Sequence, residues 1–88
     1  QSLLVLSRVE RAEQLREAID RGQVVVVMKL SRSEEAVRDF LRTDPSVSIL
    51  YGEYIGDEDR ELVTDILRSL PETPFPYFSL LIIKPSTR

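Results

Sequence analysis

The chain of 88 residues contains no cysteine and no histidine. Without cysteine it can form no disulfide and offers no thiol nucleophile or iron–sulfur ligand. Without histidine as well, it lacks the usual nitrogen and sulfur ligands of zinc and the general base of a Ser-His-Asp triad. Carboxylates, arginines, tyrosines and the two lysines, Lys29 and Lys84, are the main reactive groups that remain. We therefore expect a protein that is not an enzyme and that binds no metal and no cofactor.

Charge and length set further limits. The 15 acidic and 12 basic residues give a net charge of −3, whereas a generic binder of nucleic acid needs an excess of positive charge. The longest apolar run, Val24–Met28, is far shorter than the roughly 20 residues of a membrane helix. We expect one α/β domain over residues 1–88 with a short polar tail at 84–88, located in the cytoplasm, without a membrane span or a nucleic-acid partner.

Apolar runs alternate along the chain with stretches of helical periodicity. The short runs predict four strands, at 3–6, 24–28, 47–51 and 78–83. Apolar positions spaced three and four residues apart predict three helices, at 8–21, 31–42 and 57–70. Ser7 with Glu10, and Ser31 with Glu34, have the spacing of a capping box at a helix start. Gly22 is expected to follow the first helix in the left-handed conformation.

This order, βαβαβαβ, is typical of an α/β fold. Strands separated by helices favour parallel pairing with right-handed crossovers. The run Val24–Met28 does not alternate with polar residues, which is typical of a strand that is buried on both faces. The sequence therefore predicts a four-stranded mixed sheet that is mostly parallel, with the last strand as the candidate for antiparallel pairing. It places the three helices on both faces of that sheet.

The turn after the second predicted strand is a candidate anion site. In open α/β sheets, ligands bind beyond the carboxyl ends of strands, where N–H groups at a helix start point outward. The basic and hydroxyl side chains expected there are Lys29, Ser31, Arg32 and Ser33. The same residues also fit ordinary helix capping, because the turn has no glycine and because Glu34 and Glu35 add negative charge.

Five of the six aromatic residues follow residue 50. Tyrosine and phenylalanine beside a stiff, proline-rich connector can form an exposed contact surface. The residues predicted for a protein interface are Tyr51, Tyr54, Phe75 and Tyr77. One alternative is that most of these rings complete a small core. Another is that the apolar last strand is an edge that pairs with another chain.

The last predicted strand and the segment before it resemble the thioredoxin-like superfamily. Val24–Leu30 looks like that family's central strand, residues 31–33 fall where its redox cysteines stand, and Phe75-Pro76-Tyr77-Phe78 looks like its cis-proline step. The resemblance implies a thioredoxin-like fold with an antiparallel last strand. Because the cysteines are missing, it also implies a relative that lacks oxidoreductase activity and is used for binding.

These features together predict a small module that catalyses no reaction. It would work by contact with a protein partner or by self-association as a homodimer. The alternative is a small-ligand or phosphate-binding protein, or an enzyme, that uses the turn Lys29–Ser33.

Overall fold

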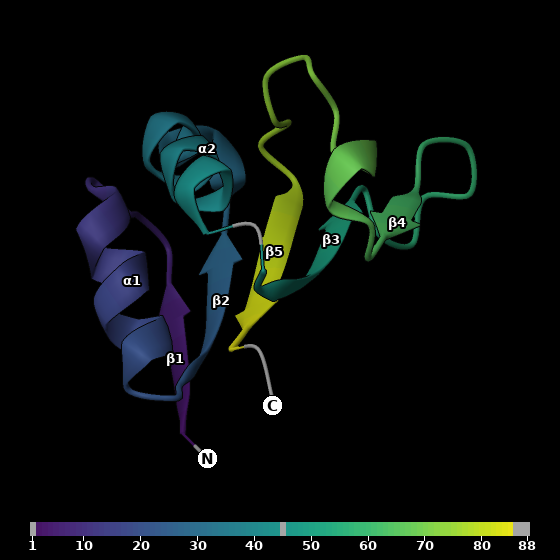
Figure 1. Ribbon diagram of the computed structural model, residues 1–88. Coiled ribbons are helices and arrows are strands. Elements are labelled where there is room, and N and C mark those ends of the chain that lie inside the picture. Colours follow the sequence, from purple (N-terminus) through teal and green to yellow (C-terminus); the bar gives the residue numbers. More distant parts are fainter. Residues whose placement is uncertain (1, 45, 86–88) are drawn as a thin grey trace.

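A five-stranded mixed sheet forms the centre of the molecule (Figure 1). The computed structural model describes residues 2–44 and 46–85. The strands are β1 (Leu3–Leu6), β2 (Val24–Met28), β3 (Ser48–Glu53), β4 (Leu62–Thr64) and β5 (Ser79–Lys84). The helices are α1 (Ala12–Asp20) and α2 (Glu34–Thr43), and single 3₁₀ turns lie at Leu30–Arg32 and Leu67–Ser69.

The last strand of the chain lies in the middle of the sheet. The strand order is β1-β2-β5-β3-β4. β1 and β2 are parallel neighbours, whereas β5 runs antiparallel to both of its neighbours, β2 and β3. β3 and β4 form an antiparallel pair at the other edge. The two central pairings therefore cannot form until residues 79–84 are in place.

These elements correct the four-stranded, three-helix fold predicted from the sequence. The βαβαβαβ order fails at residues 57–70, where the structure has turns and β4 instead of a third helix. Val63, Thr64 and Ile66 are β-branched, which lowers helix propensity and favours a strand. Val63 pairs with Gly52 of β3. The apolar positions that resemble a helical stripe are therefore divided between an edge strand and a turn.

The first helix begins later than its capping-box spacing predicts. α1 starts at Ala12, and Gln14 Oε1 accepts hydrogen bonds from the backbone N–H groups of Glu10 and Arg11 at 2.7 and 3.0 Å. These bonds satisfy two donors that would otherwise lack a partner near the helix start. The left-handed conformation of Gly22 is confirmed, with φ at 79°.

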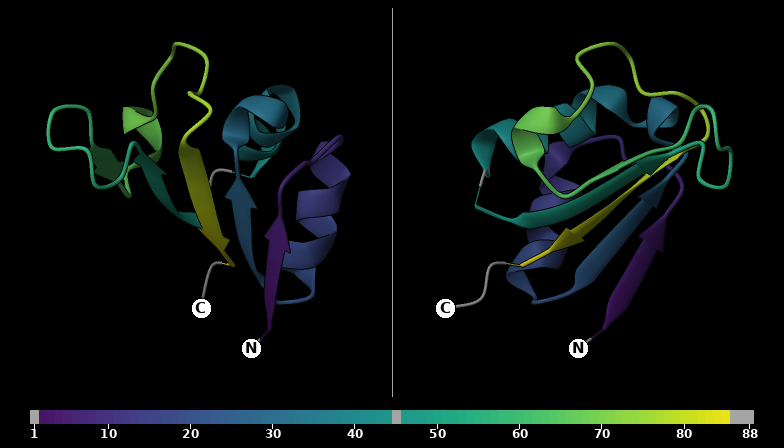
Figure 2. Two further views of the ribbon diagram at one scale, coloured as in Figure 1. Left: turned by 180° about the vertical axis from the view of Figure 1, so that it is seen from behind. Right: turned by 90° about the vertical axis from the view of Figure 1, so that its right-hand side faces the viewer.

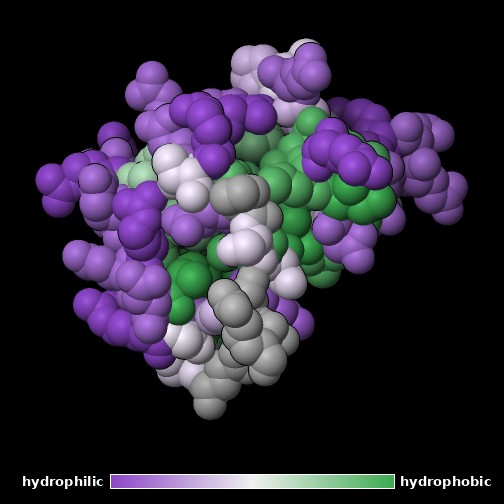
Figure 3. Space-filling model, viewed as in Figure 1, coloured by the Kyte–Doolittle hydropathy of each residue, from purple (hydrophilic) through white to green (hydrophobic). Residues whose placement is uncertain are grey.

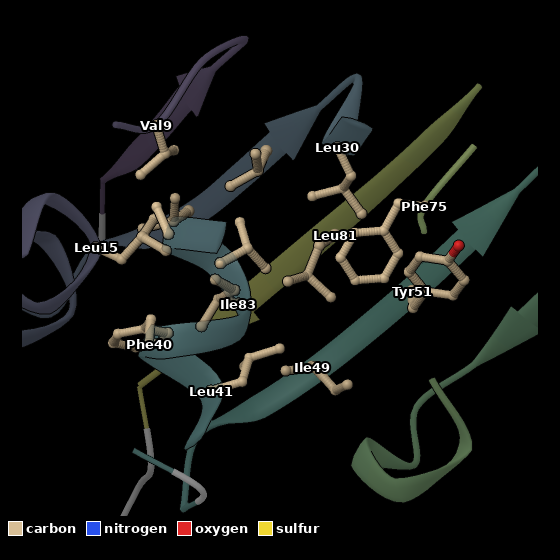
Figure 4. Close-up of a cluster of buried hydrophobic side chains, with 14 of the residues drawn as sticks. Val9, Leu15, Leu30, Phe40, Leu41, Ile49, Tyr51, Phe75, Leu81 and Ile83 are labelled. Carbon is tan, nitrogen blue, oxygen red and sulfur yellow. The ribbon is translucent and has the colours of Figure 1, made fainter. Parts of the chain in front are cut away.

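Both helices pack on the same face of the sheet, the helix-covered face (Figure 2). The core lies between this face and the helices (Figure 4), and its members are Val9, Leu15, Ala18, Val25, Val27, Leu30, Ala36, Val37, Phe40, Leu41, Ile49, Tyr51, Phe75, Leu81 and Ile83. Hydrophilic side chains cover the outer surfaces of α1 and α2, and hydrophobic ones gather around β4 (Figure 3). Neither helix of the described residues is long and apolar enough to cross a lipid bilayer.

The opposite face is also apolar, yet no helix of the described chain covers it; we call it the open face. Strand register places on it side chains from all five strands, namely Leu3, Val5, Val24, Val26, Met28, Leu50, Val63, Leu80 and Ile82. Leu3 is 62% exposed, Val5 55% and Leu50 42%. The prediction of helices on both faces is therefore wrong, and β2 is covered by helices on one face alone.

The expected boundary of the polar tail also changes. Lys84 is the last residue of β5 and so belongs to the sheet rather than to a polar tail, and residues 86–88 lie outside the described residues. The peptide bond before Pro76 is trans, whereas the family's motif has a cis-proline. The thioredoxin-like resemblance itself stays a prediction.

Ser33 ties the start of α2 to the loop that follows β1. Its side chain is buried, and its Oγ accepts a 2.7 Å hydrogen bond from the backbone N–H of Val9. The hydroxyl therefore serves this long-range contact and makes no side-chain capping bond to α2. A buried N–H that loses its acceptor destabilises a fold by about 1–3 kcal/mol.

We expect Ser33→Ala to lower the free energy of unfolding by about 1–3 kcal/mol, because the N–H of Val9 is then buried without an acceptor. Urea titration followed by circular dichroism measures the change. Ser31→Ala is the matched control: Ser31 is exposed in the same turn, and we expect a change below about 0.5 kcal/mol. Equal losses in the two variants would contradict the assigned role of Ser33.

Candidate functional site

A crevice opens on the open face at the carboxyl end of β2. Its volume is about 240 Å³ and its lining is mostly apolar, formed by Met28, Lys29, Gly52, Ile55, Tyr77, Phe78, Ser79 and Leu80. Met28, Leu80 and Gly52 are paired neighbours across β2, β5 and β3, so they form the floor. Ile55, Tyr77 and Phe78 come from the connecting loops and form the walls.

Gly52 lets a wall residue lie directly over the floor. A Cβ atom at this position would lie 2.6 Å from Cδ1 of Ile55, which is closer than van der Waals contact allows. Ile55 is itself 60% exposed. A side chain at residue 52 would therefore displace the exposed end of the Ile55 side chain, which forms one wall of the crevice.

Two residues at the crevice have a left-handed backbone. φ is 56° at Lys29 and 51° at Tyr54, and no other non-glycine residue in the described parts of the chain has a positive φ. The N–H of Lys29 donates to the carbonyl of Ser79, and the N–H of Tyr54 donates to the carbonyl of Phe78, both at 2.9 Å. Backbone strain of this kind concentrates at functional sites. Both residues with a strained backbone are therefore hydrogen-bonded to residues that line the crevice.

Aromatic rings extend the wall into solvent. The rings of Tyr77 and Phe78 meet edge to face with centroids 5.3 Å apart, and Phe78 lies 6.3 Å from Tyr54. Lys29 Nζ is 5.7 Å from the Tyr77 centroid, and the Arg60 guanidinium is 4.3 Å from that of Tyr54. Phe78 is nevertheless 68% exposed. Exposed rings held in place beside an apolar hollow form a surface suited to contact with a partner.

The four aromatic residues predicted for an interface fall into two pairs. Tyr77 lines the crevice and is 48% exposed, and Tyr54 lies beside it with its ring against that of Phe78. Tyr51 and Phe75 are fully buried in the core, with ring centroids 5.5 Å apart. Their side chains therefore cannot touch a partner at the surface. The predicted set of four leaves out Phe78, which belongs to the same group of aromatic residues after residue 50, and sequence reasoning missed Ile55.

The structure does not gather the residues predicted to bind an anion, which are Lys29, Ser31, Arg32 and Ser33. Lys29 lines the crevice, whereas Arg32 and Ser33 line a separate polar hollow together with Glu34 and Glu35. The hydroxyl of Ser33 already accepts a hydrogen bond from a backbone N–H. The turn therefore presents its basic groups at different places, and carboxylates lie beside Arg32.

The acidic loop after β3 is occupied by internal contacts. Asp57 pairs with Arg60 at 2.8 Å, and Glu61 accepts a hydrogen bond from the N–H of Gly56 at 2.7 Å. The hydrogen bond from Arg60 holds the pKa of the Asp57 carboxyl below its ordinary value. Within residues 2–44 and 46–85, no group of three or more His, Cys, Asp or Glu side chains is placed to hold a metal ion.

Arg38 of α2 clamps the segment that leads to the crevice wall. Its guanidinium group donates to the carbonyls of Pro71 and Thr73 at 2.9 and 3.0 Å and lies 4.1 Å from the ring centroid of Phe75. Glu34 pairs with Arg38 and accepts a 2.9 Å hydrogen bond from the N–H of Phe75. Two side chains of α2 therefore fix the connector between β4 and β5.

Comparison with known proteins finds a solved structure with a similar fold but assigns the chain to no family. No family model matches the chain, and no curated protein matches it. Among solved structures, the crystal structure of the methyltransferase CobJ matches with a TM-score of 0.63 at 14% sequence identity. The match covers 97% of this chain and 41% of the methyltransferase, so the chain spans about two-fifths of that protein's length. At this identity, the likeness shows the fold alone.

Folding changes the pKa of the Tyr51 hydroxyl group. Burial raises the pKa of its hydroxyl well above the ordinary 10.0, and a 2.6 Å hydrogen bond from that hydroxyl to Glu53 Oε2 adds to the shift. The unfolded chain therefore loses this proton near pH 10, while the folded chain keeps it. A group whose pKa is raised by folding contributes its full stabilisation of the folded state at pH values below its pKa in the unfolded chain. This contribution is lost progressively as the pH rises above that value.

We expect the free energy of unfolding to fall above about pH 10, by at most about 1.4 kcal/mol per pH unit from this single group. Tyr51→Phe should remove this part of the alkaline loss, because phenylalanine does not ionise in either state. Urea titrations at a series of pH values between about 8 and 11 measure it. Tyr77→Phe, at an exposed ring, should leave the loss intact; the same alkaline loss in Tyr51→Phe as in the unchanged protein would contradict the assignment.

Proposed function

We propose that this chain is a protein-interaction module that docks through its open face and catalyses no reaction. The extent of that face carries the proposal. Strands about 4.8 Å apart with about 3.3 Å per residue give an apolar sheet surface on the order of 400 Å². The largest apolar patch on a typical monomer covers about 300–600 Å² and is often functional, and a face of this size lies in that range. The crevice and its exposed rings continue the same surface at one end.

The distribution of polar groups supports docking of a protein. Ser48, Asp65 and Lys84 line a hollow with Leu50 and Ile82 near the end of β5, and Lys29 stands at the opposite end. The centre of the face between them is apolar. An apolar centre with charged and hydroxyl groups at its rim is the usual anatomy of a protein–protein interface.

A second candidate is a small-ligand site in the crevice. Its position at the carboxyl end of β2 favours this function, because ligands of α/β sheets bind near strand ends, and the fold likeness is to a methyltransferase. Its volume of about 240 Å³ is below the roughly 300–1,000 Å³ of sites that enclose a drug-sized ligand. The crevice would therefore hold part of such a ligand, and other protein groups would complete the site.

Met28 reports on both candidates, because it is the single methionine of the chain and lies 43% exposed on the open face. Peroxide oxidises a thioether that solvent can reach. If a protein covers the face in the cell, Met28 should oxidise several-fold more slowly there than in dilute purified chain. Peptide mass spectrometry measures the oxidised fraction, and an Arg21→Met variant at an exposed position supplies the internal reference rate.

A Leu50→Met variant adds a second reporter on the open face, and leucine-to-methionine changes are well tolerated. Slow oxidation at positions 28 and 50 together supports docking of a protein. Slow oxidation at position 28 alone supports the small-ligand site instead. If both positions oxidise in the cell at the rate of the reference position, the proposed docking function fails.

A further inference from the structure

We propose that the partner on the open face is a second copy of this chain, packed sheet against sheet in a two-fold symmetric dimer. This inference rests on the proposed function, because it names the occupant of the same face. Three properties of the face support it: its width, its area and the charges at its rim.

The width of the face favours a sheet as the occupant. Five strands about 4.8 Å apart span on the order of 24 Å, whereas a helix is about 10–12 Å wide with its side chains. A single helix would therefore leave about half of the strands uncovered. A second sheet packs about 10 Å away with its strands near −30°, and the side chains of the two faces interdigitate. The aliphatic residues at the centre of the face, such as Val26, Leu50 and Ile82, suit such packing.

The area of the face is sufficient for a specific but weak dimer. Two faces on the order of 400 Å² each, extended by the exposed walls of the crevice, bury on the order of 1,000 Å² in total. This reaches the lower limit of a biological interface, where complexes are transient. Ile55 and Phe78, which are 60% and 68% exposed, supply part of that extension. We therefore expect association that depends on concentration in the micromolar range.

The charged groups at the rim are complementary between two copies. Lys84 and Asp65 line the same hollow at one end of the face, and neither forms an ion pair within the part of the chain that the structure describes. A second copy presents one lysine and one aspartate of its own at its rim. Each charge can therefore meet an opposite one, whereas a rim with a single sign of charge would repel its own copy.

Leu50 and Leu62 provide a matched pair of variants for the test. They belong to the paired strands β3 and β4 and have similar exposure, 42% and 38%. Strand register places Leu50 on the open face and Leu62, opposite Glu53, on the helix-covered side. Leu50→Lys puts a charge into the centre of the proposed interface, where desolvation opposes association. Leu62→Lys makes the same chemical change outside it.

Light scattering on the purified chain measures its average mass at concentrations from about 1 to 200 µM. This range covers dissociation constants in the micromolar range. We expect the unchanged chain and Leu62→Lys to rise from 10.1 kDa toward twice that mass, and Leu50→Lys to stay at 10.1 kDa at every concentration. A chain that never exceeds the mass of one copy overturns the inference. So does a dimer that survives Leu50→Lys, because it then forms through an edge strand or another surface.

A second measurement applies if Leu50→Lys fails to fold. The chain has no cysteine, so Leu50→Cys and Leu62→Cys each carry a single thiol. A short bis-maleimide should join two copies of Leu50→Cys several-fold more efficiently than two copies of Leu62→Cys, and equal yields overturn the inference. If no dimer forms while positions 28 and 50 are protected in the cell, docking holds with a different partner. If neither is observed, both proposals fail.

Discussion

β5 is held between β2 and β3 by two antiparallel ladders, and the rest of the structure depends on that position. Its alternate residues serve both faces: Leu81 and Ile83 fill the core, and Leu80 and Ile82 lie on the open face. The chain must return from the edge strand β4 to the centre of the sheet. Its connector passes beside α2, where Arg38 holds it, and ends at the rings that wall the crevice. The position of the candidate site is thus a consequence of the strand order.

The handedness of the crossovers explains why one face is open. α1 joins β1 to β2, and α2 joins β2 to β3; the two strands of each pair run in the same direction. Both crossovers move across the sheet from the β1 edge toward the β4 edge. Right-handed crossovers that proceed in one direction place their helices on one face. The remaining connections, from β3 to β4 and from β4 to β5, contain no α-helix, so the other face receives no layer.

Local sequence patterns predicted four of the five strands, because apolar runs are a local signal. The runs at 3–6 and 24–28 match β1 and β2 to the residue, and those at 47–51 and 78–83 correspond to β3 and β5. Strand order depends on pairing between residues far apart in the chain, such as Leu80 with Met28 and with Gly52, which no local pattern shows. β4 has only three residues, too few for a strand pattern of its own. The crevice was not predictable for the same reason, because its lining comes from β2, β3, β5 and the loops beside them.

The apolar sequence of β2 predicts more burial than the structure gives this strand. A strand with no polar residue is typical of burial on both faces, yet the structure buries Val25 and Val27 and leaves Met28 43% exposed. Folding of the domain buries only the alternate residues of β2 that face α1 and α2, because these helices cover that face alone. The apolar residues on the other half, continued by those of β1, β3 and β5, contribute stabilisation of about 25 cal/mol per Å² only when something removes them from water. An apolar layer of similar width would satisfy the whole pattern, and this is the physical basis of the proposal that the open face docks a partner.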